Sequence, residues 1–119
     1  MKIAFSTSGQ DLQGLLESRF GRCLRFLVYD LESRNFALVE NKQNLQAAQG
    51  AGIQAAEIVL NSGADVLISG HCGPKAYKVL RAGGVRVYHA ETKPIEELLA
   101  LYQEGKLVEA LAPDVEGHW

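Results

Sequence analysis

Residues 66–74 read Val66-Leu67-Ile68-Ser69-Gly70-His71-Cys72-Gly73-Pro74, and the pattern is that of a strand followed by a helix. The apolar run 66–69 is typical of a buried strand. Pro74 suits the first turn of a helix, where its missing N–H would have no partner in any case. In open α/β sheets, ligands bind in the crevice beyond the carboxyl ends of the strands. The turn 70–73 therefore lies where a site is expected, and it carries an imidazole and a thiol.

The rest of the chain alternates strand and helix patterns. Strands are expected at 2–6, 24–30, 35–41, 66–69 and 85–89, and helices at about 53–61, 74–82 and 94–104. The polar segment 31–34 indicates a hairpin, and residues 7–23 read as a long loop with one helical turn. Strand–helix–strand units impose parallel pairing with right-handed crossovers. We therefore expect one α/β domain over residues 1–119, with a mixed five-stranded sheet, one antiparallel strand and helices on both faces.

Composition limits the function classes. The chain has 119 residues, 47% of them hydrophobic, with a formal net charge of -2 and a pI near 5.9. This charge balance disfavours a nucleic-acid partner, which usually requires a basic face. No apolar run is long enough to cross a membrane, and the first residues enter a strand pattern without a signal-peptide layout. We expect a cytoplasmic protein, and the sequence sets no oligomeric state.

The two cysteines, Cys23 and Cys72, follow no zinc spacing. In a reducing cytoplasm they are expected to be thiols rather than a disulfide. Two interpretations remain open for each: a small buried hydrophobic residue, or a soft ligand for a metal.

Seven segments along nearly the whole chain carry a resemblance to a known family. They are Lys2-Ile3-Ala4-Phe5-Ser6, Arg19-Phe20-Gly21-Arg22-Cys23, Gly50-Ala51-Gly52, residues 63–70, residues 73–76, residues 84–88 and Glu104-Gly105-Lys106-Leu107. In their order and spacing they resemble the dinitrogenase iron–molybdenum cofactor biosynthesis family, the small domain similar to nitrogenase accessory factors.

The resemblance implies both a fold and a role. The fold would be a three-layer α/β/α arrangement with a ribonuclease-H-like motif, whose second strand is antiparallel. The role would be non-catalytic: to bind or carry a metal–sulfur cluster containing molybdenum, iron or both, during cofactor biosynthesis or delivery. A protein that donates or accepts the cluster would be the partner.

A metal–sulfur cluster is a bulky anion with soft edges, so a carrier needs few ligands, several N–H donors and little water. Cys72 can ligate through its thiolate and His71 through a neutral imidazole. The start of the following helix offers N–H groups and positive potential. Gly70 and Gly73 allow the backbone to come close to a ligand. The alternative is that Gly-Pro only starts a helix and His71 is a solvated loop residue.

The segment 19–23 is the second candidate. Arg19 and Arg22 can pair with an anion, and Cys23 can be a further soft ligand. The alternative is a structural segment, in which the arginines are solvated and Cys23 is buried. For Phe20 we expect a place in the core.

Four further residues are weaker candidates. Ser6 ends the first strand, where its hydroxyl can hold an anion or fix a turn. Gly50 and Gly52 read as an anion loop rather than a nucleotide site, because the polar stretch 42–49 separates them from the preceding strand. His118 can reach a cluster as a terminal ligand, or belong to a frayed end. Mobility of residues 42–49 is expected to gate entry.

Two other functions stay open beside the cluster carrier. One is a thiol-dependent enzyme in which His71 activates Cys72. The other is a regulatory module that binds a small anion. A nuclease is disfavoured because the carboxylates that would hold two cations are scattered.

Overall fold

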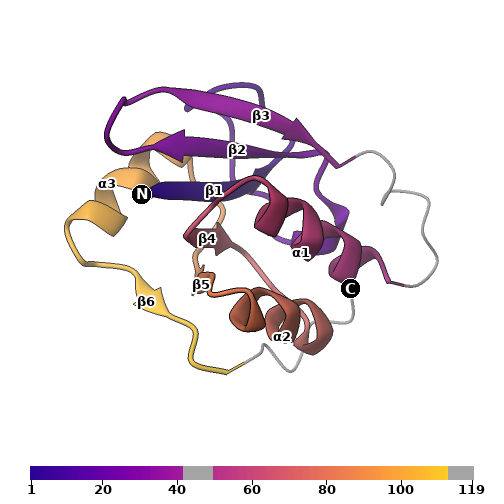
Figure 1. The fold of residues 1–119 in the computed structure, drawn as a ribbon. Helices are drawn as coiled ribbons and strands as arrows, with labels where there is room; N and C mark the ends of the chain where they lie inside the picture. Colours follow the sequence, from indigo (N-terminus) through magenta and orange to yellow (C-terminus); the bar gives the residue numbers. More distant parts are fainter. Residues whose placement is uncertain (42–49, 113–119) are drawn as a thin grey trace.

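Six strands form one mixed sheet, in the order β3-β2-β1-β4-β5-β6, in the computed structural model, which describes residues 1–41 and 50–112 (Figure 1). The strands are β1 (Lys2–Thr7), β2 (Arg25–Asp30), β3 (Phe36–Glu40), β4 (Val66–Ser69), β5 (Arg86–His89) and β6 (Val108–Glu109). The helices are α1 (Ala51–Asn61), α2 (Pro74–Ala82), α3 (Ile95–Gln103) and the short 3-10 helix η1 (Phe20–Arg22). Strands β1, β4 and β5 are parallel, and β2 is antiparallel to both β1 and β3.

The α/β class and the helices on both faces are confirmed, but the count of five strands was wrong. The described sheet has a sixth strand, β6, which is antiparallel to β5, so two strands rather than one run against β1. β6 pairs only Val108 with His89 and Glu109 with Tyr88. Two residues are too few to show the alternation by which a strand is recognised.

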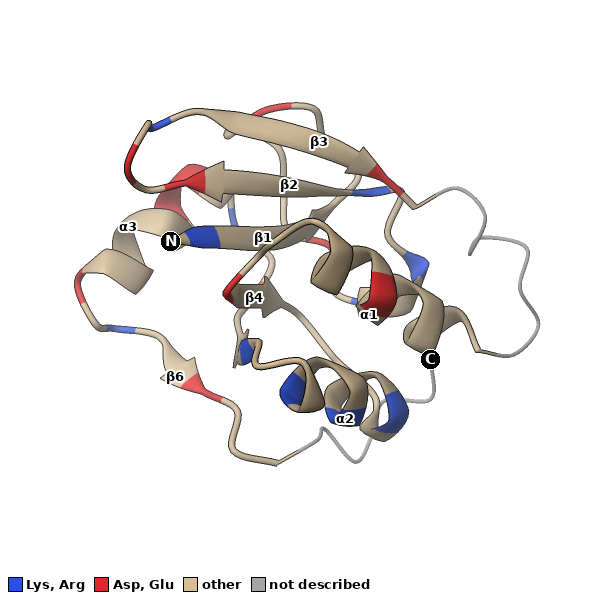
Figure 2. Ribbon diagram, in the orientation of Figure 1, with Lys and Arg blue, Asp and Glu red and all other residues tan. Residues whose placement is uncertain are grey.

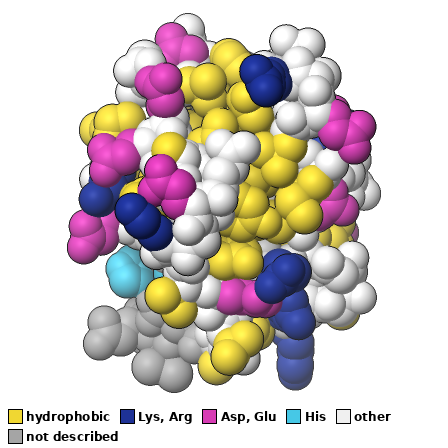
Figure 3. Space-filling model, turned by 90° about the vertical axis from the view of Figure 1, so that its left-hand side faces the viewer, with side chains coloured by type: hydrophobic (Ala, Val, Ile, Leu, Met, Phe, Trp, Pro, Cys, Tyr) yellow, Lys and Arg dark blue, Asp and Glu magenta, His cyan; other side chains and the backbone are white. Residues whose placement is uncertain are grey.

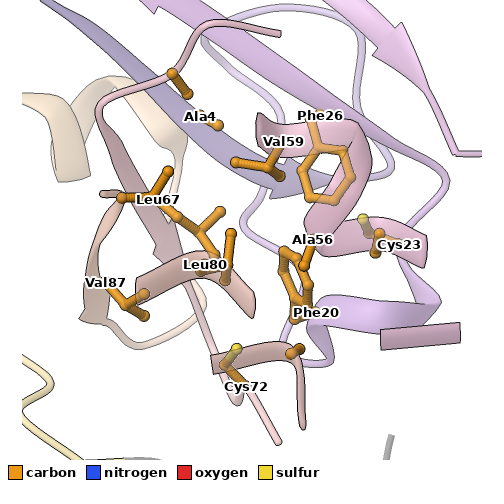
Figure 4. Packing of buried hydrophobic residues seen from close by; sticks show 14 of the residues in the cluster. Ala4, Phe20, Cys23, Phe26, Ala56, Val59, Leu67, Cys72, Leu80 and Val87 are labelled. Carbon is orange, nitrogen blue, oxygen red and sulfur yellow. The ribbon is translucent and has the colours of Figure 1, made fainter. Parts of the chain in front are cut away.

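The sheet separates two apolar clusters. Ala4, Leu67 and Val87 point toward α1 and α2, where Val59 and Leu80 meet them (Figure 4). On the other face, α3 contributes Ile95, Leu98 and Leu99, which pack against Ile3, Phe5 and Ile68. Because both faces are covered, β1 and β4 are buried along nearly their whole length, which explains their continuous apolar runs.

The helix directions fix where a site can form. α2 follows the carboxyl end of β4, and α1 leads into the amino end of β4, so the N-termini of both helices lie at the carboxyl end of the sheet (Figure 1). We call the region where β1, β4 and β5 end the carboxyl end of the sheet. It is the region in which ligands of α/β proteins commonly bind.

Apolar side chains are also exposed at the opposite end of the molecule. The face in Figure 3, which is the left-hand side of Figure 1, has a band of apolar side chains bordered by acidic and basic ones. This band therefore does not belong to the carboxyl end of the sheet. None of the helices in the described ranges is both long enough and apolar enough to cross a membrane.

Leu67 tests the packing of the cluster beneath α1 and α2. Its side chain is 0% exposed, whereas that of Leu111 is 84% exposed. We expect Leu67→Ala to lower the free energy of unfolding by about 2–5 kcal/mol, because the substitution leaves a cavity. Leu111→Ala should change it by less than about 0.5 kcal/mol. Urea denaturation followed by circular dichroism measures both, and equal effects would contradict the assignment of the core.

Candidate functional site

The segment 17–23 lies directly beside the turn that follows β4. The backbone N–H of His71 donates to the carbonyl oxygen of Ser18 over 2.6 Å, and the N–H of Phe20 donates to the carbonyl oxygen of His71 over 3.0 Å. Arg19 and His71 are thus paired like residues of two parallel strands. The two candidate segments, far apart in the sequence, form one unit.

Two glycines permit this packing. A Cβ atom on Gly70 would collide with the carbonyl oxygen and Cα of Ser18. A Cβ atom on Gly21 would lie 3.1 Å from the backbone nitrogen of Gly52 and 3.2 Å from its Cα. The segment 17–23 therefore lies between the β4–α2 turn on one side and the first turn of α1 on the other. Gly70 therefore has a packing role, and Gly52 supplies the backbone against which Gly21 packs.

Ser6 lies buried near the carboxyl end of β1, beneath the segment 17–23. Its hydroxyl is 2.8 Å from the hydroxyl of Ser69 and donates to the carbonyl oxygen of Glu17 over 3.1 Å. Both serines are 0% exposed. The Ser6 hydroxyl thus joins the ends of β1 and β4 to the segment 17–23.

Both cysteines belong to the apolar cluster under α1 and α2. Cys23 and Cys72 are each 0% exposed, and Figure 4 shows their side chains among those of the core. Burial raises the pKa of Cys23 to about 12, even though the Thr7 backbone N–H and the Asn41 side chain act to lower it. Cys23 is therefore a neutral thiol at physiological pH. No group of three or more His, Cys, Asp or Glu within residues 1–41 and 50–112 is arranged to hold a metal ion.

The accessible part of the region is basic. Arg19 and His71 are exposed, and Arg22 is half-buried. Neither α1 nor α2 has an acidic residue in its first turn, and the N-cap residues Gly50 and Gly73 have no side chain with which to cap the N–H groups there. Such N–H groups carry positive potential and bind anions well. Among the described residues, Glu17 adds a negative charge nearby, and its carboxylate accepts the Arg19 backbone N–H over 3.4 Å.

The structure thus brings together most of the residues that the sequence singled out. Their shared place is the carboxyl end of the sheet, where Ser6, Arg19, Arg22, Cys23, Gly50, Gly52, Gly70, His71, Cys72 and Gly73 lie on elements in mutual contact. The expected core place of Phe20 is confirmed, since its side chain is 0% exposed. His118 and the expected gating segment 42–49 lie outside the described residues.

Three residues that organise the region were missed. Ser18 supplies the backbone against which Gly70 packs, Ser69 pairs with Ser6, and Asn41 donates to the carbonyl oxygen of Cys23 over 2.9 Å. Ser69 is a polar residue at the end of an apolar strand, directly before the candidate turn, and this position could have indicated that it belongs to the region. Nothing in the local pattern of Ser18 or Asn41 indicated contacts so distant in the sequence.

The close packing at Gly70 predicts an unequal pair of glycine substitutions. Gly63→Ala meets open space but adopts a φ of +81°, so it should cost about 1–2 kcal/mol of stability. Gly70→Ala must displace the Ser18 backbone, so we expect it to cost at least about 3 kcal/mol. Chemical denaturation of both variants measures the difference. A Gly70→Ala variant no less stable than Gly63→Ala would show that the contact is loose.

The burial of Cys23 predicts a slow thiol. In a Cys72→Ser variant, Cys23 is the one cysteine left of two. We expect its reaction with an aromatic disulfide reagent at pH 8 to be at least about a hundredfold slower than in urea, because the fold must open first. Rapid reaction without denaturant would contradict the burial of this thiol.

The same thiol predicts a dependence of stability on pH. Its pKa is 9.0 when unperturbed and about 12 in the fold, so its stabilising contribution is complete below pH 9 and is lost as the pH rises toward 12. The loss amounts to about 1.4 kcal/mol per pH unit. The free energy of unfolding should therefore fall more steeply over this range in the wild type than in Cys23→Ala.

The chain is similar in sequence and in fold to known proteins. The sequence profile of the family described as "Dinitrogenase iron-molybdenum cofactor" matches residues 1–105. An uncharacterised protein of Methanocaldococcus jannaschii is 36% identical over 110 residues, which cover 90% of this chain and 89% of the relative.

Two solved structures are also similar. The apo form of the orange protein of Desulfovibrio gigas superposes with a TM-score of 0.92 at 33% identity, with 95% of each chain covered. A Thermotoga protein provisionally assigned as NifB gives a TM-score of 0.84 at 33% identity, with 98% of each chain covered. With its sequence matched over residues 1–105 and its fold shared with these relatives, the chain belongs to the dinitrogenase iron–molybdenum cofactor family.

Proposed function

We propose that this protein binds a metal–sulfur cluster as cargo, without catalysis, during the biosynthesis or delivery of a molybdenum- or iron-containing cofactor. Family membership supports the link to iron–molybdenum cofactor biosynthesis. The observation that carries the proposal is the basic carboxyl end of the sheet, where the first turns of α1 and α2, which contain no acidic residue, lie beside Arg19 and Arg22. A metal–sulfur cluster is anionic, and this is the kind of surface that holds an anion.

We further propose that the cluster is held mainly by charge and N–H donors rather than by cysteine sulfur. Both sulfurs lie in the apolar cluster, and Cys23 has a pKa far above physiological pH. The thiolate is the form that ligates metals. The basic groups nearest the helix N-termini are the guanidinium groups of Arg19 and Arg22 and the imidazole of His71, of which Arg19 and His71 are exposed and Arg22 is half-buried. The N–H groups in the first turns of α1 and α2 would be further donors. Cys72 would ligate only after the turn 70–73 opens.

The burial of Cys72 also disfavours a thiol-dependent enzyme. A nucleophilic thiol needs access for its substrate, and the Cys72 side chain is 0% exposed. A module that binds a small anion would use the same donors as a cluster carrier, so it is the alternative that the experiment below must distinguish.

The order of the strands also bears on the fold family. We propose that β3-β2-β1-β4-β5 is the ribonuclease-H-like motif expected from the family, with β6 as an added strand. The strand order and the antiparallel β2 support it. The carboxyl end of β1 carries Ser6 rather than an acid, so this motif offers no carboxylate there for the cations of a nuclease.

Anaerobic reconstitution tests the cargo and its mode of binding. The protein is incubated with iron, molybdate and sulfide, desalted, and assayed for bound metal and charge-transfer absorbance. We expect Arg19→Glu/Arg22→Glu to retain about fivefold less metal than the wild type, because two positive charges that would attract the anionic cluster become negative charges that repel it. Cys72→Ser should retain metal within about twofold of the wild type if sulfur does not ligate. Arg34→Glu, an exposed residue in the β2–β3 hairpin, is the control and should load normally.

Each of the other outcomes has a distinct meaning. Loss of loading in Cys72→Ser would show that the sulfur ligates and would overturn binding by charge alone. No metal uptake in any variant, together with phosphate binding measured by calorimetry, would favour the small-anion module instead.

A further inference from the structure

The outer face of α2 carries basic residues that the cluster proposal does not use. Lys75, Lys78 and Arg81 recur every three residues, while Ala76 and Leu80 on the other side of the helix are 0% exposed. α2 contains no acidic residue, and Figure 2 shows the basic residues along it. A basic face is unexpected in a chain with a net charge of -2.

Lys75 and Lys78 differ from most other basic residues of the described chain. Lys93 pairs with Glu97 at 3.1 Å, and Lys106 pairs with Glu104 at 3.2 Å. Arg81 lies 3.6 Å from Glu109. Among residues 1–41 and 50–112, by contrast, no carboxylate pairs with Lys75 or Lys78, and both side chains are exposed. Their charge is available to an outside group.

A shallow hollow lies between these charges. It has a volume of about 370 Å³ and is lined by Pro74, Lys75, Tyr77, Lys78 and Arg81. Its surface is mostly apolar, because the aliphatic stems of the long side chains and the Tyr77 ring form its walls. The Tyr77 hydroxyl donates to the carbonyl oxygen of Ala110 over 2.8 Å, which fixes the position of the ring. The hollow has room for one large apolar side chain.

We propose that this basic face of α2 docks an acidic segment of a partner protein, in which carboxylates flank one apolar side chain. The carboxylates would pair with Lys75 and Lys78, and the apolar side chain would enter the hollow. A nucleic acid fits less well, because a phosphate backbone has no side chain to place in an apolar hollow.

The basic face of α2 lies next to the proposed binding region. Pro74 directly follows the turn 70–73, so a partner bound on α2 lies beside the proposed cargo. The identity of the partner as a donor or acceptor of the cluster rests on the proposed function. The docking surface itself rests on α2 alone and can be tested without cargo.

NMR titration of the full-length, cargo-free protein with a capped Glu-Glu-Leu-Glu-Glu peptide tests the proposal. We expect chemical-shift changes centred on residues 74–81. Lys78→Glu should weaken binding about threefold or more, whereas the matched reversal Lys106→Glu, at a lysine between α3 and β6 rather than on α2, should have little effect. Binding should weaken as sodium chloride is raised from about 0.05 to 0.5 M.

Two altered peptides separate the charges from the hollow. Replacing the glutamates by glutamines should abolish binding, and replacing the leucine by serine should weaken it. Lys78→Glu should still load metal like the wild type, and Arg19→Glu/Arg22→Glu should still bind the peptide. Failure of the docking surface and failure of the cluster proposal are therefore distinguishable.

Three results would overturn the proposal. The first is equal affinity of wild type, Lys78→Glu and Lys106→Glu for the acidic peptide. The second is dimerisation of the wild type that Lys78→Glu abolishes, because a second copy would then occupy the surface. The third is peptide binding that occurs only after Asp114→Asn and Glu116→Gln, because the chain's own carboxylates would then be the occupant.

Discussion

The contact between Gly70 and the backbone of Ser18 determines the shape of the carboxyl end of the sheet. It allows the segment 17–23 to hydrogen-bond with the turn after β4, as if a short parallel strand had been added there. On its other side, the segment packs through Gly21 against the first turn of α1. One backbone contact that only glycine permits thus holds Arg19 and Arg22 beside both helix N-termini.

The same arrangement explains why the region is basic although its two thiols are buried. Cys23 is the last residue of the segment 17–23, and Cys72 belongs to the turn 70–73. Both side chains lie in the apolar cluster, where they pack as small hydrophobic residues. The residues that face outward at these places are Arg19 and His71. A buried thiol is costly to ionise, whereas an arginine keeps its charge at the surface. Anion binding is therefore the chemistry that this surface offers most directly.

Much of the fold could be predicted because its signals are local. The apolar run 66–69, Pro74 and the glycines that end the helices mark the parallel β–α units, and the family resemblance covers most of the chain. β6 was missed because two residues are too few to show a periodic pattern. Its residues pair with Tyr88 and His89 at the end of β5, and nothing in the sequence of β6 itself indicates that contact. For the candidate site, the sequence indicated the residues and their shared end of the sheet. It did not indicate that Cys72 points inward, because adjacent residues of an irregular turn have no fixed side-chain direction.

The hydroxyl pair of Ser6 and Ser69 has a consequence for how cargo can be released. It joins the ends of β1 and β4 through a fully buried hydrogen bond, and Ser6 is bonded in turn to the carbonyl oxygen of Glu17. The base of the region is thereby held together before any ligand binds, so ordering it on binding costs little conformational entropy. Under the proposed function, release of the cargo would leave these two strands in place. It would depend instead on competition for the cargo at the solvent-facing side of the region.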